Sequence, residues 1–374
     1  MKRGAGPGAH EIVDVDAAAE IGVRNSQREG IGRVVVLDEL ICWNNLGRNV
    51  VFADRGFRPH SVFGETLFPD DDESSQYDLD IHAVLDVPHG GLVLVLNHLG
   101  IVRAFRREDL GGLGPPRRVA PTATTSFPAD AERAVVAGQC LVGSSPRCDG
   151  AQGVLVSAPI RDVLPRVLEV GLANERFGEV TALGTVNGAS EPQVALGGVG
   201  RVALAPVVGG EMLRPRWEVD VGFRTAVVVS ADGLLWAAGC AITGAVDDYD
   251  WEGLRGGGFA VLDPDDGRMV AEGPVPEDVA WGTGGVAVVV AGGHLVAVGR
   301  TGRLYLLDPR RPGQWRSTLP LAASSLGLAH ADAVGRHVLF GFNRGGYRLH
   351  LGAGPVRDVD RLAGGEPSGR LDGR

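Results

Sequence analysis

A glycine followed by a short apolar strand recurs seven times in this chain of 374 residues. Clear copies are LGRNVVFADR from Leu46, GGFAVLDPDD from Gly257 and TGRLYLLDPR from Thr301. Repeats of about 40–50 residues built of short strands are typical of propeller blades. The sequence therefore predicts an all-β fold, a seven-bladed β-propeller of four-stranded antiparallel blades. The glycines, spaced by 53, 53, 47, 58, 44 and 43 residues, are Gly47, Gly100, Gly153, Gly200, Gly258, Gly302 and Gly345.

The expected strands are short runs rich in Val, Leu and Tyr, each bounded by Gly or Pro. We name the four strands of a blade A to D from the axis outward. Only residues 14–24 have the pattern of a short helical turn, so almost no helix is expected. In the sixth blade the strands are expected at Val286–Val290, Leu295–Gly299, Gly302–Asp308 and Trp315–Leu319. In the second blade they are expected at His82–Val87, Leu92–Asn97, Ile101–Arg106 and Arg117–Ala120, and in the fifth at Ala226–Ser230, Leu234–Gly239, Phe259–Asp263 and Met269–Glu272.

The repeat divides the chain into three parts. Residues 30–362 form the expected propeller, residues 1–29 an N-terminal arm, and residues 363–374 a disordered tail rich in glycine and charge. In the arm, Glu11–Val15 has the pattern of a strand that pairs with an outer strand and helps to close the ring. The segment Val356–Leu362 is the other candidate for closure, and the sequence leaves the choice open.

Two segments share a motif in which an apolar strand is followed by Leu-Asp-Pro, a glycine-containing turn and a second strand. They are residues 259–272 (FAVLDPDDGRMVAE) and 303–319 (RLYLLDPRRPGQWRSTL). Through this motif the chain resembles the pyrroloquinoline-quinone-like and YVTN-type β-propeller repeat proteins. The shared residues belong to turns and core, so the resemblance implies the fold and does not imply a function.

The charge of the chain argues against two classes of partner. Its formal net charge is −10, and it has no basic stripe that could neutralise phosphates. We therefore expect no nucleic-acid partner, and the same charge disfavours an anionic membrane surface. Lys2 is the only lysine, which argues against a Walker phosphate loop and against lysine-based catalysis.

The four cysteines, Cys42, Cys140, Cys148 and Cys240, have no C-x-x-C spacing, so neither a zinc site nor a redox pair is expected. Cys42, Cys140 and Cys240 fall in apolar strands, where a thiol packs as a small apolar side chain. The first residues, MKRGAGPGAH, lack the apolar stretch of a signal peptide. We therefore expect a cytoplasmic protein with reduced thiols.

The long connections gather on one face of the expected propeller. In propellers the D–A and B–C connections lie on one face, and the A–B and C–D connections on the other. The long loops Gly64–Leu79, Gly143–Gln152 and Ile242–Gly257 are all of the first kind. Clustered carboxylates can keep a loop soluble, form a rim for a basic partner, or bind a divalent cation such as Ca²⁺, and these interpretations stay open. The acidic residues of two of these loops are Asp70, Asp71, Asp72 and Glu73, and Asp247, Asp248 and Asp250.

A second polar group lies where the inner strands are expected to begin. Asp78, Asp80 and His82 alternate along the chain, so all three would point to one side of a strand, near the channel mouth. Two carboxylates and an imidazole can hold a metal ion or act as general acid and base, and can equally satisfy backbone groups. Trp281 and Trp251 would add stacking surface nearby. Other charged residues expected at inner-strand starts are Glu132, Glu179, Arg224, Asp278 and His330.

These observations favour an interaction module over an enzyme. The first hypothesis is a non-catalytic scaffold whose acidic, loop-rich face recognises another protein or a small molecule. The second is a metal-dependent hydrolytic enzyme, similar to lactonase or lyase propellers, with a divalent cation as cofactor at Asp78, Asp80 and His82. A quinone-dependent dehydrogenase is a third hypothesis, disfavoured because no export signal is present. The binding residues expected under the first hypothesis are Asp247, Asp248, Tyr249, Asp250, Trp251 and Trp281, with Tyr249 and Trp251 as aromatic anchors.

Overall fold

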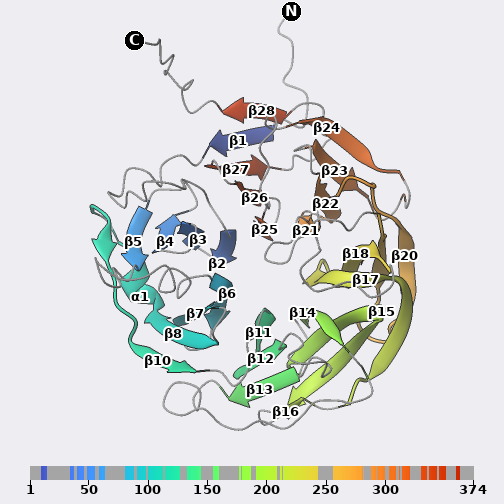
Figure 1. The fold of residues 1–374 in the computed structure, drawn as a ribbon, viewed down its shortest axis with the longest axis horizontal. Coiled ribbons are helices and arrows are strands. Elements are labelled where there is room, and N and C mark those ends of the chain that lie inside the picture. The colour runs from blue at the N-terminus through green and yellow to red at the C-terminus, as the bar shows by residue number, and fades with distance from the viewer. Residues whose placement is uncertain are drawn as a thin grey trace, which may run out of the picture.

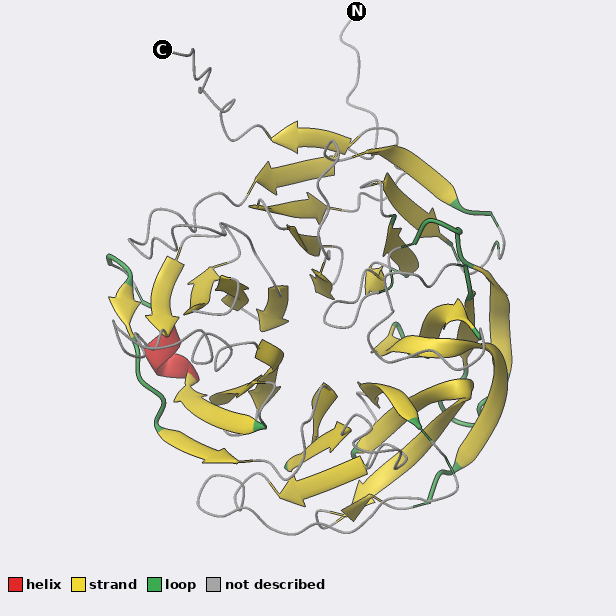
Figure 2. Ribbon diagram, in the orientation of Figure 1, coloured by secondary structure: helices red, strands yellow, loops and turns green. Residues whose placement is uncertain are grey.

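A computed structural model of the chain shows strands arranged as a ring around an axis (Figures 1 and 2). Within the part of the chain that it describes, the only helix is the four-residue α1 (Arg107–Leu110). The expected all-β propeller is therefore confirmed, whereas the number of blades stays a prediction. The described residues are 10–14, 34–37, 40–45, 49–54, 59–63, 81–87, 91–97, 100–112, 114–126, 133–144, 155–159, 177, 179–186, 191–208, 211–212, 214–242, 256–279, 281, 288–291, 293–299, 303–308, 311, 314–320, 330–334, 337–342, 345–350 and 359–362.

The first half of the ring contains three sheets of short strands, in which neighbours are antiparallel and follow chain order except at β9. The first sheet contains β2 (Val34–Leu37), β3 (Leu40–Asn45), β4 (Asn49–Asp54) and β5 (Pro59–Phe63), with β9 (Arg117–Arg118) parallel to β5. The second contains β6 (Ile81–Val87), β7 (Leu92–Asn97), β8 (Ile101–Arg106) and β10 (Ala123–Ser126). The third contains β11 (Arg133–Ala137), β12 (Cys140–Ser144) and β13 (Leu155–Pro159).

The second half contains one large sheet and two smaller ones. The large sheet contains β14 (Val180–Val186), β15 (Gln193–Val208), β16 (Glu211–Met212), β17 (Trp217–Ala231), β18 (Leu234–Ala241), β19 (Gly258–Leu262) and β20 (Met269–Pro274). The next contains β21 (Val288–Ala291), β22 (His294–Val298), β23 (Arg303–Leu307) and β24 (Arg316–Pro320). The last contains β25 (His330–Val334), β26 (His337–Phe342), β27 (Gly345–His350), β1 (His10–Asp14) and β28 (Val359–Leu362).

The innermost strands contact one another in a closed cycle around the axis (Figure 1). Hydrophobic clusters fill the spaces between neighbouring sheets; one of them joins side chains of β18 and β19 to side chains of β21 to β23. Burial of these apolar side chains, at about 25 cal/mol per Å², supplies the main stabilisation of such a ring. In order, the innermost strands are β2, β6, β11, β14, β17, β21 and β25, and β25 contacts β2.

The two long strands of the large sheet, β15 and β17, each pair with two neighbouring strands. Val207 donates its backbone N–H to the carbonyl of Pro192 over 2.8 Å, although a straight strand of this length would span about 50 Å. β15 therefore folds back on itself at Val199–Gly200, where Gly200 has a φ of 75°. β17 pairs with β15 through its first half and with β18 through its second. It is thus an outer strand that continues without a loop into the next inner strand.

Both ends of the chain take part in the last sheet. β1 pairs antiparallel with β27 and parallel with β28 (Figure 1). The expected pairing of Glu11–Val15 with an outer strand is confirmed, although β1 begins and ends one residue earlier than expected. The sequence left open which terminal segment closes the ring, and here the two segments lie side by side.

The strands expected in the fifth and sixth blades match β18 to β24 within two residues at each end, whereas the expected Ala226–Ser230 forms only the second part of the longer β17. One strand of the second blade was predicted wrongly. Arg117–Ala120 was expected as the fourth strand of that blade, but β9 pairs with β5 of the preceding sheet, and β10 pairs with β8 instead. Neither Pro121 nor the strand pattern around Val119 indicates with which of the two sheets this segment pairs.

Candidate functional site

The candidate site is the side of the ring at which the inner strands begin, which we call the entry face. Strand register brings its residues together: Arg224 lies opposite Cys240, Gly239 opposite Gly258, and Gly258 opposite Pro274. These pairs place four strand ends at one edge of the sheet. They are the start of the inner part of β17, the end of β18 (strand B), the start of β19 (strand C) and the end of β20 (strand D). The long loop that follows β18 therefore leaves the ring on this face.

The base of that loop is held by backbone contacts. The loop leaves β18 after Ile242 and returns at Gly256–Gly257. The indole N–H of Trp281 donates to the carbonyl of Gly256 over 3.0 Å, and the N–H of Val275 donates to that of Gly257 over 3.2 Å. Gly257 has a φ of 120°, and a Cβ there would lie 1.9 Å from the carbonyl oxygen of Gly239. The chain thus returns to the ring through a fixed point that only glycine fits.

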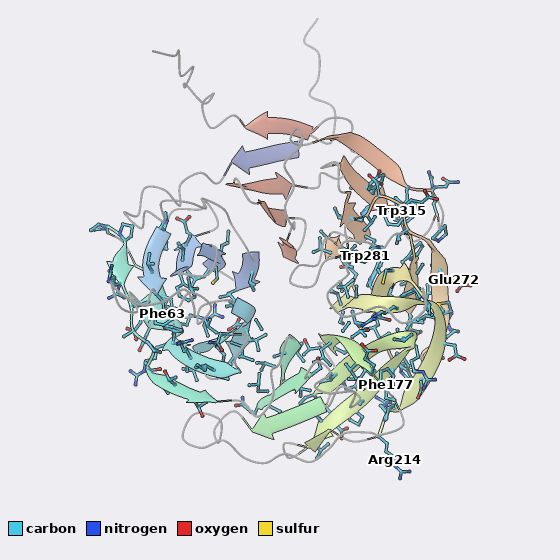
Figure 3. All side chains as sticks on the ribbon, in the orientation of Figure 1. Phe63, Phe177, Arg214, Glu272, Trp281 and Trp315 are labelled. Carbon is cyan, nitrogen blue, oxygen red and sulfur yellow. The ribbon has the colours of Figure 1, made fainter. Side chains whose placement is uncertain are left out.

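Trp281, expected as a stacking surface, is placed in the core. Its residue is only 3% exposed and packs in the cluster that contains Trp236 and Phe259. It lies nearer the middle of the ring than Trp315, as Figure 3 shows. In this position the indole presents no free face to a ligand and instead fixes the loop base through Gly256.

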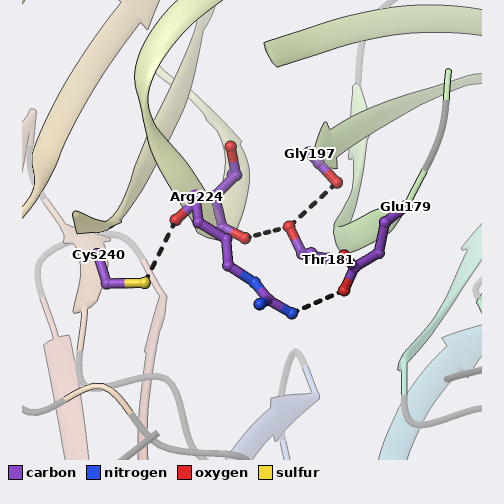
Figure 4. A network of polar contacts seen from close by, with 6 residues as sticks. Glu179, Thr181, Gly197, Arg224 and Cys240 are labelled. Atoms are coloured by element: carbon purple, nitrogen blue, oxygen red, sulfur yellow. Dashed lines mark hydrogen bonds and ion pairs between the residues drawn. The ribbon is translucent and has the colours of Figure 1, made fainter. Parts of the chain in front are cut away.

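A polar network joins the starts of two neighbouring inner strands (Figure 4). The guanidinium Nη2 of Arg224 donates to Oε1 of Glu179 over 2.7 Å. The two side chains are 10% and 30% exposed, so solvent screens this ion pair only in part. Thr181 donates its hydroxyl to the carbonyl of Thr225 over 2.5 Å, and the thiol of Cys240 lies 3.9 Å from the carbonyl of Arg224. The network therefore fixes β14 against β17.

A second polar contact lies one sheet further along the same face. The hydroxyl of Tyr305, on β23, donates to Oδ1 of Asp278 over 2.5 Å. A Cβ at Gly299 would lie 2.6 Å from Oδ2 of Asp278 and 3.0 Å from the Tyr305 ring, so these groups are tightly packed. Asp278 was expected at an inner-strand start. It lies ten residues before β21 begins, beside Val279, which forms an isolated bridge with Gly299, and its carboxylate links this segment to the C strand.

The other predicted site residues fall mostly outside the described residues. Among the described residues, no group of three or more His, Cys, Asp or Glu side chains is placed to hold a metal ion. The backbones of His82 and His330 lie in β6 and β25. The predicted residues outside the described ranges are Asp70, Asp71, Asp72, Glu73, Asp78, Asp80, Glu132, Asp247, Asp248, Tyr249, Asp250 and Trp251.

Two exposed apolar side chains on the entry face were not predicted from the sequence. Val199 is 40% exposed at the tip of the β15 hairpin, and Ile242 is 51% exposed at the end of β18. Ile242 lies beside Gly200, the chain neighbour of Val199, since a Cβ at Gly200 would lie 3.6 Å from Cδ1 of Ile242. A valine in a two-residue turn, where polar residues prevail, was the available signal.

Comparison with known proteins supports the fold and goes no further. No family model and no curated protein matches the chain. Among solved structures, the Pan2 WD40 domain of Neurospora crassa is similar, with a TM-score of 0.58, 12% identity, and coverage of 93% of this chain and 96% of that one. BamB from Moraxella catarrhalis is similar with a TM-score of 0.52 and 12% identity, over 92% of this chain and 99% of that one. The WD40 β-propeller domain of Doa1 is similar with a TM-score of 0.53 and 11% identity, over 87% of this chain and 94% of that one. The expected fold-level resemblance to β-propeller repeat proteins is thus confirmed. In the described residues, no helix is long and apolar enough to cross a membrane.

Proposed function

We propose that this protein is a non-catalytic interaction propeller, which binds a protein or small-molecule partner through the loops of its entry face. The observation that carries the proposal is that charged groups predicted at the inner-strand starts bind other residues of the ring. Arg224 is engaged by Glu179, and Asp278 by Tyr305, so these groups join strands of the ring. Variable loops on a rigid scaffold are where propellers and similar folds place their binding residues.

The loop that follows β18 is the part of the face proposed to make the contact. Its base is fixed by Trp281 and Gly257, so the thirteen residues 243–255 would be presented from a rigid point. This segment contains four acidic residues, one arginine and the aromatic residues Tyr249 and Trp251. An aromatic anchor within a charged rim is the usual make-up of a strong contact point.

Three further features belong to the proposal. The closed cycle of inner strands supports a count of seven blades, with the large sheet counted as two. The arm at residues 1–29 and the tail at 363–374 flank this propeller. A cytoplasmic location fits the burial of Cys42, Cys140 and Cys240 as thiols.

The test is purification of the protein from its native host, with mass spectrometry of the proteins that accompany it and metal analysis of the same sample. A stoichiometric partner is expected, and replacement of residues 246–252 by a Gly/Ser segment should abolish its retention. The matched control is Asp265→Asn with Asp266→Asn, which removes acidic charge from the exposed turn between β19 and β20, at the opposite end of these strands.

Retention of the partner by the loop-replaced protein would contradict the proposed contact. A preparation with no partner and a stoichiometric divalent ion, which His82→Ala removes while cooperative melting is preserved, would contradict the non-catalytic function itself. That result would favour the metal-dependent enzyme with its site at Asp78, Asp80 and His82.

A further inference from the structure

Four residues of types that bind metal ions share one row of the last sheet. His337, the first residue of β26, pairs with His350, the last residue of β27. Glu11 of β1 pairs with Asp360 of β28. These four strands are neighbours in the sheet and lie side by side in Figure 1. The entry of both chain ends into this sheet thus brings two acidic residues beside two histidines.

The pairing of β1 with β27 joins the two halves of this row. Ile12 lies opposite Leu349, so one step further along both strands Glu11 lies opposite His350. Opposite residues of neighbouring strands share a face of the sheet, with Cα atoms about 5 Å apart. The row therefore occupies one face of the sheet, at the edge opposite the entry face. The structure describes these four residues by backbone and register, so they are not among the side chains for which no metal-binding group is found.

Glu11 and Asp360 carry like charges where the two ends of the chain meet. Like charges directly opposite each other destabilise paired strands, so this register favours a cation close by. Arg348 lies two residues before His350, on the same face and one row further in, and a bound metal ion is the alternative. The two histidines favour the metal ion, because a neutral imidazole offsets no negative charge but is a good ligand for transition metals.

We propose that the row binds one Zn²⁺ or a similar divalent transition-metal ion, with His337, His350 and Glu11 as its ligands. Asp360 follows Glu11 at the outer end of the row and adds negative charge beside the ion. Two imidazoles and a carboxylate are a known ligand set for Zn²⁺. The ion joins the N-terminal strand to two strands of the last sheet and so stabilises the closure of the ring. This inference goes beyond the proposed interaction function and does not depend on it.

The test uses the untagged full-length protein, freed of metal with a chelator and then dialysed. Isothermal titration with Zn²⁺ should show saturable binding of one ion per chain. The melting temperature should rise with the Zn²⁺ concentration and fall again on addition of chelator, because the ion binds the folded chain in preference to the unfolded one.

The row is tested by two separate variants, His350→Gln at its centre and Glu11→Gln, which keeps the size of the side chain. Each removes one ligand and should abolish both the one-to-one binding and the rise in melting temperature. The matched control is His330→Gln, because His330 lies opposite Gly341 at the other edge of the same sheet. The control should bind Zn²⁺ as the unchanged protein does. If His350→Gln does not fold, Glu11→Gln decides alone.

The outcomes separate this site from the other hypotheses. The proposal is overturned if the unchanged protein binds no Zn²⁺, if both row variants still bind it, or if His330→Gln loses it equally. Loss of the ion in His82→Ala with retention in His350→Gln would also overturn it, and would favour the metal-dependent enzyme. None of these results bears on whether the entry face retains a partner, so the interaction function is tested independently.

Discussion

The ring joins its neighbouring sheets in two physically different ways, and the contrast is sharpest between the first junction and the middle one. At the first, the chain leaves β8 of the second sheet, pairs with β5 of the preceding sheet as β9, and returns to the second sheet as β10. At the middle junction, within the large sheet, β17 itself runs from one group of strands into the next. Buried apolar side chains fill both junctions. The first junction adds a chain crossing with an apolar anchor, whereas the middle junction adds a continuous backbone and a partly buried ion pair.

The anchor of the first junction is Leu110, the last residue of α1. It is fully buried in a cluster with Phe52, Phe63 and Phe105, so a residue after β8 completes the core of the preceding sheet. The hydroxyl of Ser61 donates to the carbonyl of Leu110 over 2.8 Å, which satisfies a buried acceptor at the helix end. Apolar burial thus holds this crossing in place.

Arg107, which directly follows β8, holds the start of this chain crossing through polar contacts. Its guanidinium forms an ion pair with Asp86 of β6 and approaches the carbonyl of Leu37 of β2 at 3.4 Å. The chain returns through Val119, whose N–H donates to the carbonyl of Val62 over 3.0 Å. The middle junction has no such excursion, because the continuous backbone of β17 makes one unnecessary. Its two groups of strands are joined by a buried apolar cluster that includes Phe223 and Leu235, and by the polar contacts of Glu179, Thr181 and Arg224.

The largest effect is expected at the apolar anchor. Leu110→Ala should lower the free energy of unfolding by about 2–5 kcal/mol, because it removes buried methyl groups and leaves a cavity among aromatic rings. Urea unfolding followed by tryptophan fluorescence measures it. Leu235→Ala, at an equally buried leucine of β18, is the control for a cavity of similar size in the middle junction.

The first junction also shows where sequence reasoning fails. The strands with Leu-Asp-Pro turns, β19 and β23, were predicted closely because turn residues and apolar alternation are local signals. The segment at Arg117–Ala120 was assigned to the wrong sheet, since its partner is chosen by the burial of Leu110 several residues earlier. Pairing that depends on a distant anchor leaves no trace in the local pattern.

A smaller effect is expected at the middle junction. Glu179→Gln should cost about 1–3 kcal/mol of unfolding free energy, because the mostly buried Arg224 loses its charged partner. Glu218→Gln is the matched control, since the ion pair of Glu218 with Arg201 is solvent-facing and should cost less than about 1 kcal/mol. Equal losses in the two variants would contradict a structural role for the Glu179–Arg224 pair.

The candidate site was predictable in its residues and not in their pairing. The sequence placed Glu179, Arg224 and Asp278 at inner-strand starts, where charged side chains stand out from apolar runs. That Glu179 meets Arg224, 45 residues later, depends on the continuity of β17 and its register with β15 and β18. For Trp281 the prediction was wrong, because the sequence near the expected channel mouth does not show whether an aromatic side chain faces solvent or the core.

The smallest perturbation uses the native thiols as reporters of each junction. Cys42 belongs to the same cluster as Leu110, and Cys240 lies beside Arg224. Burial raises the pKa of the Cys42 thiol, so the folded state keeps it neutral and unreactive. This contribution to stability is present below the ordinary thiol pKa of about 8.5 and is lost as pH rises above it, because the unfolded chain ionises first.

Alkylation by iodoacetamide, with the labelled peptides identified by mass spectrometry, should therefore be slow for both thiols in the native protein. Leu110→Ala should speed labelling of Cys42 and leave Cys240 unchanged, whereas Glu179→Gln should do the reverse. Local opening of separate units produces such a pattern. If either variant speeds both thiols to the same extent, the ring opens as a whole, and the two junctions differ in chemistry without differing in independence.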